Sequence, residues 1–297
     1  MERTELTLDS ADLIESAKRQ AAFQAVRDYL LPSSRFVGIG SGTTVQYVVE
    51  AIVHKGPEFY STMAFVPTGS QSKLLIIKSG LALCNLDERP LVNGSPVPID
   101  VAFDGADEID EDLNLIKGGG ACLFQEKLVA ISAVKFVAVA GNIRMLTAEL
   151  DYRKQSSRLC TQWKTIPLEV LPLAAPLVLH RLKAIGSSNA ALRSGMPGKA
   201  GECVTDNGMW IIDAQFPPLL LSGDLKSDLE GKGGDKGWEI ENLAQELLSV
   251  PGIVEIGLFH GFNGEQATSL RREFQAQKPV AAYFGMPDGH VHIQHAT

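Results

Sequence analysis

The sequence predicts an α/β protein built around a mainly parallel, doubly wound sheet. Short apolar runs at residues 35–40, 64–67 and 98–103 predict buried strands. The first two runs are each followed by a turn rich in glycine and hydroxyl side chains, and then by a helical pattern. Because strands that alternate with helices pair in parallel and carry helices on both faces, we expect this fold class.

The other elements of this sheet domain follow from the same patterns. Apolar residues at helical spacing predict a first helix over 13–31, which follows plausible N-cap residues and is stopped by Pro32. Two more helices are predicted over 45–52 and 73–78, each after one of the hydroxyl-rich turns. Residues 133–140 supply another apolar strand.

A second unit of α+β character is predicted in the latter half of the chain. Residues 166–174 indicate an edge-like strand because they contain proline, and residues 204–213 indicate a strand, a turn and a second strand. A helix over 239–250 then runs into a strand over 251–259. A hairpin over 280–293 is expected near the C-terminus.

We therefore expect two domains, which the length of 297 residues allows. Residues 1–163 and 278–297 would form a Rossmann-like sheet domain, and residues 164–277 would form the α+β domain inserted between them. The polar, glycine-rich stretch 222–237 is expected to be a solvated surface loop without a catalytic part.

The net charge of −8 argues against a nonspecific nucleic-acid or anionic-membrane surface, although a local basic pocket for an anion remains compatible with it. The four cysteines are widely spread and show no Cys-x-x-Cys spacing, which favours reduced thiols over a zinc site. No segment approaches the roughly 20 apolar residues of a membrane span. We expect a cytoplasmic protein without a metal.

The densest group of reactive side chains follows the predicted strand 98–103. Asp104 and Asp107 come directly after it, and Lys117 precedes three successive glycines, Gly118–Gly120. The ligand crevice of an open α/β sheet lies at the carboxyl ends of its strands, and successive glycines let a backbone approach a ligand closely. An acidic surface loop with a flexible turn is the alternative, but the combination favours an active site.

Two turns suit a small anionic ligand. Residues 38–44 and 68–72 end parallel strands with glycine and hydroxyl groups, at positions where helix N-termini stabilise anions. The first turn lacks the third glycine and acidic partner of a dinucleotide fingerprint, and it also lacks the lysine of a nucleotide-triphosphate loop. Nicotinamide cofactors and ATP are therefore disfavoured. A purely structural tight turn is the alternative for each segment.

Glu126 is expected in the first turns of a helix that follows the glycines. Apolar neighbours such as Leu123 and Phe124 would raise its pKa toward neutrality, which suits a group that takes and returns a proton. The alternative is an exposed helix glutamate paired with Lys127 or Lys135.

A resemblance to a known family rests on six segments: Gly38–Thr44, Pro67–Lys73, Asp104–Asp110, Leu113–Gly120, Val204–Gly208 and Tyr283–Met286. These segments resemble the type A ribose-5-phosphate isomerases, in particular their eukaryotic branch. The resemblance implies an inserted ferredoxin-like domain and a homodimer or higher homo-oligomer. It also implies interconversion of ribose 5-phosphate and ribulose 5-phosphate in the non-oxidative pentose phosphate pathway, with neither a metal nor an organic cofactor.

The resemblance implies a role for each candidate residue. Glu126 would move a proton between carbons two and one of the sugar through a cis-enediolate. Asp104 and Asp107 would bind sugar hydroxyls and assist ring opening, and Lys117 would offset the charge on the enediolate oxygen. The remaining substrate contacts would come from a set of backbone amides, hydroxyls and other polar groups: Gly118, Gly119, Gly120, Ser41, Gly42, Thr43, Thr44, Thr68, Ser70, Gln71 and Lys18.

The chain departs from the family pattern in one place that concerns phosphate. Residues 141–150 look inserted, and the lysine that usually faces the phosphate is replaced by Ser157. Lys154 and Arg158 are the possible substitutes. Two smaller departures are Ala121, where a fourth glycine is usual in the family, and Gly69, where serine is common.

Two alternatives stay open at this point. A noncatalytic sugar-phosphate sensor would need the phosphate-binding turns but no catalytic base, so it would tolerate loss of Glu126. A related enzyme, such as an amino-sugar-phosphate deaminase or a coenzyme A transferase, would instead release ammonia or exchange an acyl group.

Overall fold

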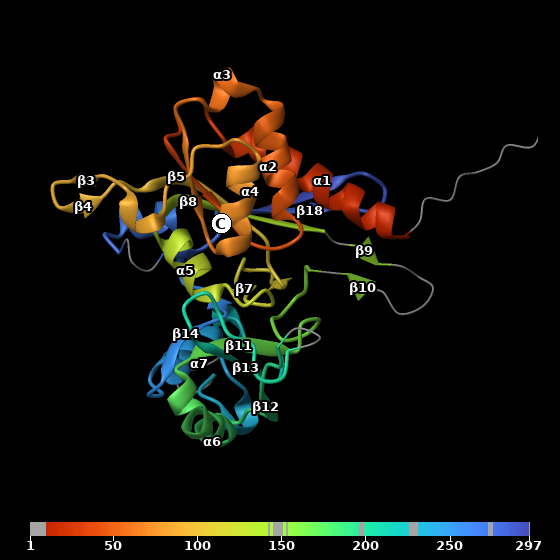
Figure 1. Ribbon diagram of the computed structural model, residues 1–297. Helices are drawn as coiled ribbons and strands as arrows, with labels where there is room; N and C mark the ends of the chain where they lie inside the picture. The colour runs from red at the N-terminus through yellow and green to blue at the C-terminus, as the bar shows by residue number, and fades with distance from the viewer. Residues whose placement is uncertain are drawn as a thin grey trace, which may run out of the picture.

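The computed structural model describes the chain over residues 10–141, 143–144, 151–152, 154–195, 199–225, 231–272 and 276–296. Figure 1 shows a larger unit around a central sheet and a smaller unit, carrying β11 to β14, beside it. Most of the apparent insertion 141–150 lies outside the described residues. Within the described part, no helix is both long enough and apolar enough to cross a bilayer.

A six-stranded sheet of order β19-β18-β8-β5-β1-β2 forms the centre of the larger unit. All neighbouring strands in it are parallel except β19, which pairs antiparallel with β18. Their bounds are β1 Phe36–Ile39, β2 Ala64–Pro67, β5 Ile99–Asp104, β8 Ala133–Gly141, β18 Ala281–Gly285 and β19 Val291–His295. The predicted parallel sheet and C-terminal hairpin are confirmed.

Helices pack on both faces of this sheet (Figure 1). Side chains alternate across β5, so Val101 and Phe103 pack in one core cluster with α1 and α2, whereas Ala102 packs with Val129 of α5 in another. The sheet is therefore doubly wound, as predicted. The helices are α1 Ser10–Tyr29, α2 Val45–His54, α3 Pro57–Tyr60, α4 Ser70–Lys78 and α5 Leu123–Ile131.

Short elements surround the sheet. A small antiparallel sheet has the order β15-β7-β6, β3 and β4 form a hairpin, β9 pairs with β10, and β16 runs parallel to β17. The strands are β3 Leu91–Val92, β4 Ser95–Pro96, β6 Glu108–Ile109, β7 Leu115–Ile116, β9 Ile143–Arg144, β10 Asp151–Tyr152, β15 Leu258–Phe259, β16 Phe262–Asn263 and β17 Ala276–Lys278. The 3-10 helices are Leu86–Glu88, Pro172–Ala174, Ser222–Asp224 and Gly234–Lys236.

The smaller unit has a ferredoxin-like arrangement. Its antiparallel sheet has the order β12-β13-β11-β14, and its elements follow one another as β-α-β-β-α-β. Helices α6 and α7 pack on this sheet through a separate core cluster that includes Leu182 and Leu243. The bounds are β11 Thr165–Val170, α6 Ala175–Ile185, β12 Asn189–Leu192, β13 Trp210–Gln215, α7 Ile240–Leu248 and β14 Ile253–Ile256.

The prediction of an edge-like strand at 166–174 is wrong. The strand β11 lies between β13 and β14, and it ends at Val170. The carbonyl of Pro167 accepts the N–H of Gly257 at 2.7 Å, so the proline nitrogen faces the same side. Pro167 is tolerated there because the carbonyl of Gly257 instead accepts the N–H of Lys117 at 2.9 Å.

The return of the chain to the larger unit was expected at residue 278. Phe259 already packs against Phe136 of β8, with ring centroids 6.3 Å apart, and helix α8 (Gly264–Ser269) also contacts β8. The segment after Asn263 contains this helix, which the side chain of Asn263 caps. We therefore propose that the chain returns near Gly257.

Candidate active site

A cavity opens where the carboxyl ends of β1 and β5 meet the glycine loop. The free space between its lining residues, which includes space open to solvent, is about 490 Å³. In the described part of the chain, no three or more His, Cys, Asp and Glu side chains are arranged to hold a metal ion. The lining residues are Ser41, Gly42, Thr43, Thr44, Gly105, Ala106, Asp107, Lys117, Gly118, Gly119, Gly120, Glu126 and Lys154.

Lys117 stands between two buried carboxylates. Its Nζ lies 3.0 Å from Asp104 Oδ2 and 3.4 Å from Glu126 Oε2, and it donates to the carbonyl of Gly105 at 2.5 Å. Asp104 sits at the end of β5, and its other oxygen accepts the backbone N–H of Ser41 at 3.1 Å. All three charged side chains are buried. One cation therefore faces two carboxylates, so a single positive charge cannot balance both when they are ionised.

Burial decides the direction of the pKa shift for both carboxylates of this group. It raises the pKa of Glu126 to about 8, because the opposing effect of Lys117 is smaller and Asp104 and Asp107 raise the pKa further. Burial also raises the pKa of Asp104 despite Lys117 and two backbone amides. Burial lowers the pKa of Lys117, but the two carboxylates outweigh it and leave the pKa raised. Glu126 can thus exchange a proton near neutral pH beside a lysine that stays charged.

The glycine loop follows Lys117 and faces Asp107. The N–H of Gly119 donates to Asp107 Oδ2 at 2.7 Å. Gly118 has a φ of 104°, which favours glycine, and a Cβ on Gly119 would lie 2.8 Å from Asp107 Oδ1. Glycine is needed at these positions for two different reasons, namely backbone conformation at the first and close approach of a carboxylate at the second.

The two hydroxyl-rich turns lie against each other. The hydroxyl of Ser41 is 2.8 Å from that of Thr68, and the N–H of Gly42 donates to Gln71 Oε1 at 2.8 Å. Lys18 of α1 donates to the hydroxyl of Thr43 at 3.0 Å. Of the two turns, only the first lines the cavity. Thr68, Ser70 and Gln71 of the second turn do not line it, and neither does Lys18.

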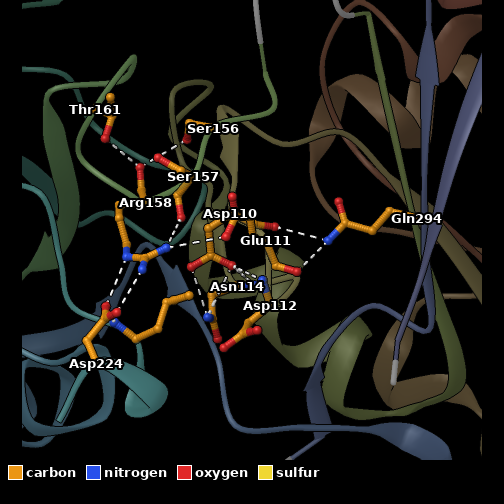
Figure 2. Close-up of polar contacts among 11 residues, drawn as sticks. Asp110, Glu111, Asp112, Asn114, Ser156, Ser157, Arg158, Thr161, Asp224 and Gln294 are labelled. Carbon is orange, nitrogen blue, oxygen red and sulfur yellow. Dashed lines mark hydrogen bonds and ion pairs between the residues drawn. The ribbon is translucent and has the colours of Figure 1, made fainter. Parts of the chain in front are cut away.

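Lys154 and Arg158 differ sharply in position. Lys154 lines the cavity, and its Nζ lies 3.8 Å from Asp107 Oδ1. Figure 2 shows Arg158 turned toward Asp224, to whose carboxylate it donates at 3.0 and 2.8 Å. Ser157 is exposed. Of the two possible substitutes for the missing lysine, only Lys154 is at the cavity.

Three side chains of the smaller unit reach this region without having been predicted. Asp206 accepts the N–H of Ser70 at 2.7 Å, Asn207 accepts a hydrogen bond from the Gln125 amide at 3.0 Å, and Arg193 donates to the glycine loop. Asp206 and Asn207 belong to one of the six family-like segments, which was the available clue. Arg193 stands in no recognisable local pattern.

Comparisons with known proteins agree over most of the chain. The family model described as ribose 5-phosphate isomerase A (phosphoriboisomerase A) matches residues 64–269. A protein of Debaryomyces hansenii named ribose-5-phosphate isomerase is 43% identical over 284 residues, which are 95% of this chain and 91% of that protein. Its counterpart in Mycosarcoma maydis is 40% identical over 285 residues, covering 96% of this chain and 82% of that protein.

A solved structure has the same fold. It is described as D-ribose-5-phosphate isomerase in complex with phospho-erythronic acid, and it is 30% identical to this chain with a TM-score of 0.70. The alignment covers 95% of this chain and 99% of that one, so both units are included.

Proposed function

The chain belongs to the ribose 5-phosphate isomerase A family and is a ribose-5-phosphate isomerase, and on that premise we propose that Glu126 is its catalytic base. The observation that carries this proposal is the environment of Glu126 Oε2. This oxygen is buried, accepts no hydrogen bond in the described part of the chain, and has only the Lys117 ammonium at 3.4 Å. Glu126 also lines the cavity, so its carboxyl group borders the substrate space with an oxygen that no hydrogen bond of the described protein engages.

In the proposed reaction, Glu126 removes the proton from carbon two of the open-chain aldose. The C–H electrons form the double bond of a cis-enediolate, and negative charge develops on the oxygen of carbon one. Lys117 stabilises that charge at short range in a buried site. Glu126 then returns the proton to carbon one, and the hydroxyl proton of carbon two passes to the oxygen of carbon one. A raised pKa supports this two-way role, because the same carboxyl must accept and release the proton.

The other lining groups support binding of the rest of the substrate. Ser41–Thr44 precede α2, whose N-terminus favours an anion such as phosphate, and Lys154 adds a positive charge on the same cavity. Asp107 lines the cavity and is proposed to bind sugar hydroxyls and assist ring opening. Asp104 is buried outside the lining set, and its proposed part in these steps acts through Lys117, whose Nζ lies 3.0 Å from Asp104 Oδ2. Phosphate binding would hold carbon one and carbon two beside Glu126.

The test uses the purified wild type and Glu126→Gln, assayed for ribulose 5-phosphate formation in D₂O without added metal. We expect the variant to lose about 10²–10⁴ in kcat, and to lose deuterium incorporation at carbon one as well. Glu241→Gln, an exposed change on α7, serves as the control. Wild-type turnover in Glu126→Gln would refute the base assignment. A folded wild type that binds phospho-erythronic acid but does not turn over would instead favour a sensor.

We further propose that the protein is cytoplasmic, serves the non-oxidative pentose phosphate pathway and forms a homo-oligomer. The smaller unit supports the last point, because Leu173 is 96% exposed and Leu171 and Leu177 are exposed beside it. Light scattering after gel filtration would measure the mass, and a monomer at micromolar concentration would contradict the proposal.

A further inference from the structure

Arg193 connects the smaller unit to the glycine loop of the catalytic cavity. It directly follows β12, and its side chain is largely buried. One nitrogen of its guanidinium, Nη1, donates to the carbonyls of Gly118 at 2.8 Å and Gly119 at 3.0 Å. The other two, Nε and Nη2, donate to the two carboxylate oxygens of Asp213 at 2.8 and 2.5 Å. We propose that Arg193, oriented by Asp213, is a positioning residue that holds the glycine loop so that the Gly119 amide meets Asp107 and the Gly120 amide faces the substrate.

The argument begins with the geometry of the peptide group. In a planar trans peptide the N–H points away from the carbonyl oxygen. The carbonyls of Gly118 and Gly119 both turn toward Arg193, so the N–H groups of Gly119 and Gly120 point to the opposite side. On that side the N–H of Gly119 meets Asp107, and the loop lines the cavity. The Gly118 carbonyl also accepts the N–H of Ala121 at 3.0 Å, so Arg193 fixes the orientation of the loop together with this turn and is the side chain that holds the Gly119 carbonyl.

The positive charge of the Arg193 guanidinium, which lies beside the two carbonyls, also changes the electrostatics of the loop. Burial lowers the pKa of Arg193, but Asp213 outweighs it and leaves the pKa raised, so the guanidinium stays charged. It withdraws electron density from both peptides, which makes the Gly119 N–H a better donor to Asp107 and the Gly120 N–H a better donor to the substrate. Preorganised donors of this kind stabilise negative charge as it develops in a transition state. The effect would act on the enediolate, so this inference rests on the proposed reaction.

The arrangement requires arginine rather than any cation. A planar guanidinium presents donors in a fixed fork, so it can satisfy a carboxylate with one edge and two carbonyls with another nitrogen. Asp213 lies on β13 opposite Ala191 of β12, so the sheet holds both partners in register. A lysine would keep the charge but could not make both sets of contacts with fixed direction.

The test measures kcat and KM for ribose 5-phosphate in Arg193→Ala, Arg193→Lys and Asp213→Asn, with Arg181→Ala on the exposed face of α6 as the matched control. We expect kcat to fall about 10–100-fold in both Arg193 variants, and less in Asp213→Asn, while KM changes less than about 3-fold. Added guanidinium ion should restore about 10-fold of the lost kcat in Arg193→Ala and nothing in Arg181→Ala.

The outcomes separate this inference from the proposed function. An inactive wild type would overturn the proposed reaction. An active wild type with unchanged kcat in a folded Arg193→Ala would overturn the positioning role alone. So would a loss that guanidinium does not rescue, since that marks a purely structural role. If Arg193→Ala does not fold, Arg193→Lys decides, because wild-type kcat in that variant would overturn the need for a fork.

Discussion

Replacing Glu126 by glutamine should stabilise the protein at alkaline pH while it removes catalysis. The folded protein raises the pKa of this carboxyl from its ordinary value of 4.5 to about 8, chiefly by burial. Between these two values the folded state keeps a proton that the unfolded state has released. Unfolding therefore releases a proton, and raising the pH through this window lowers the free energy of unfolding. Glutamine has no such proton to lose.

The size of the effect follows from the same two values. Their difference corresponds to ~5 kcal/mol if Glu126 titrated alone. Asp104 and Lys117 titrate with it, so their protonation adjusts when Glu126 is replaced and the gain is reduced. We expect Glu126→Gln to exceed the wild type by about 2–3 kcal/mol at pH 8 and by little at pH 5. For a chain of 297 residues that is an increase in Tm of roughly 3–5 °C.

Thermal unfolding followed by circular dichroism at pH 5, 6, 7 and 8 measures this difference. Glu241→Gln is the control, because Glu241 is exposed and should show a difference that does not grow with pH. A Glu126→Gln variant whose advantage is the same at every pH, or falls as pH rises, would refute the argument that a buried carboxylate destabilises the folded state.

Three further predictions test the geometry of the site. Gly119→Ala should lower kcat more than about 10-fold, because the new Cβ would push Asp107 away. The control Gly223→Ala, whose new Cβ meets nothing within 4 Å, should keep wild-type activity, and equal rates of the two variants in steady-state assays would contradict this. Lys154→Ala should raise KM for the sugar phosphate about 10-fold. Arg158→Ala should leave KM unchanged and lower the free energy of unfolding by at most ~1 kcal/mol. A higher KM in Arg158→Ala than in Lys154→Ala would show that Arg158 binds phosphate. Because the proposed base must be ionised, kcat/KM should rise with pH up to an apparent pKa near 8, and a pH profile that levels off below pH 5 would assign that step to another group.

Much of the architecture was predictable because local patterns and burial agree along the sheet domain. The strands at 36–39, 64–67 and 99–104 are short and mostly apolar, and each is followed at once by glycine or hydroxyl residues that mark a turn. The edge-like strand was misassigned because proline content says nothing about which neighbouring strand is present. Strand β14, which pairs with β11, is more than 80 residues further along the chain.

The sequence by itself determined which reactive groups follow the end of the strand at 99–104. Asp104, Lys117 and the glycines stand close together in the chain and belong to recognisable segments. Only the tertiary structure decided that Lys154 rather than Arg158 reaches the cavity. It also decided how deeply Glu126 is buried and that Arg193 contacts the glycine loop. The reason is physical. Residue type and local spacing set what a group can do, but pKa, charge pairing and direction depend on neighbours that lie far away in the sequence and come together only on folding.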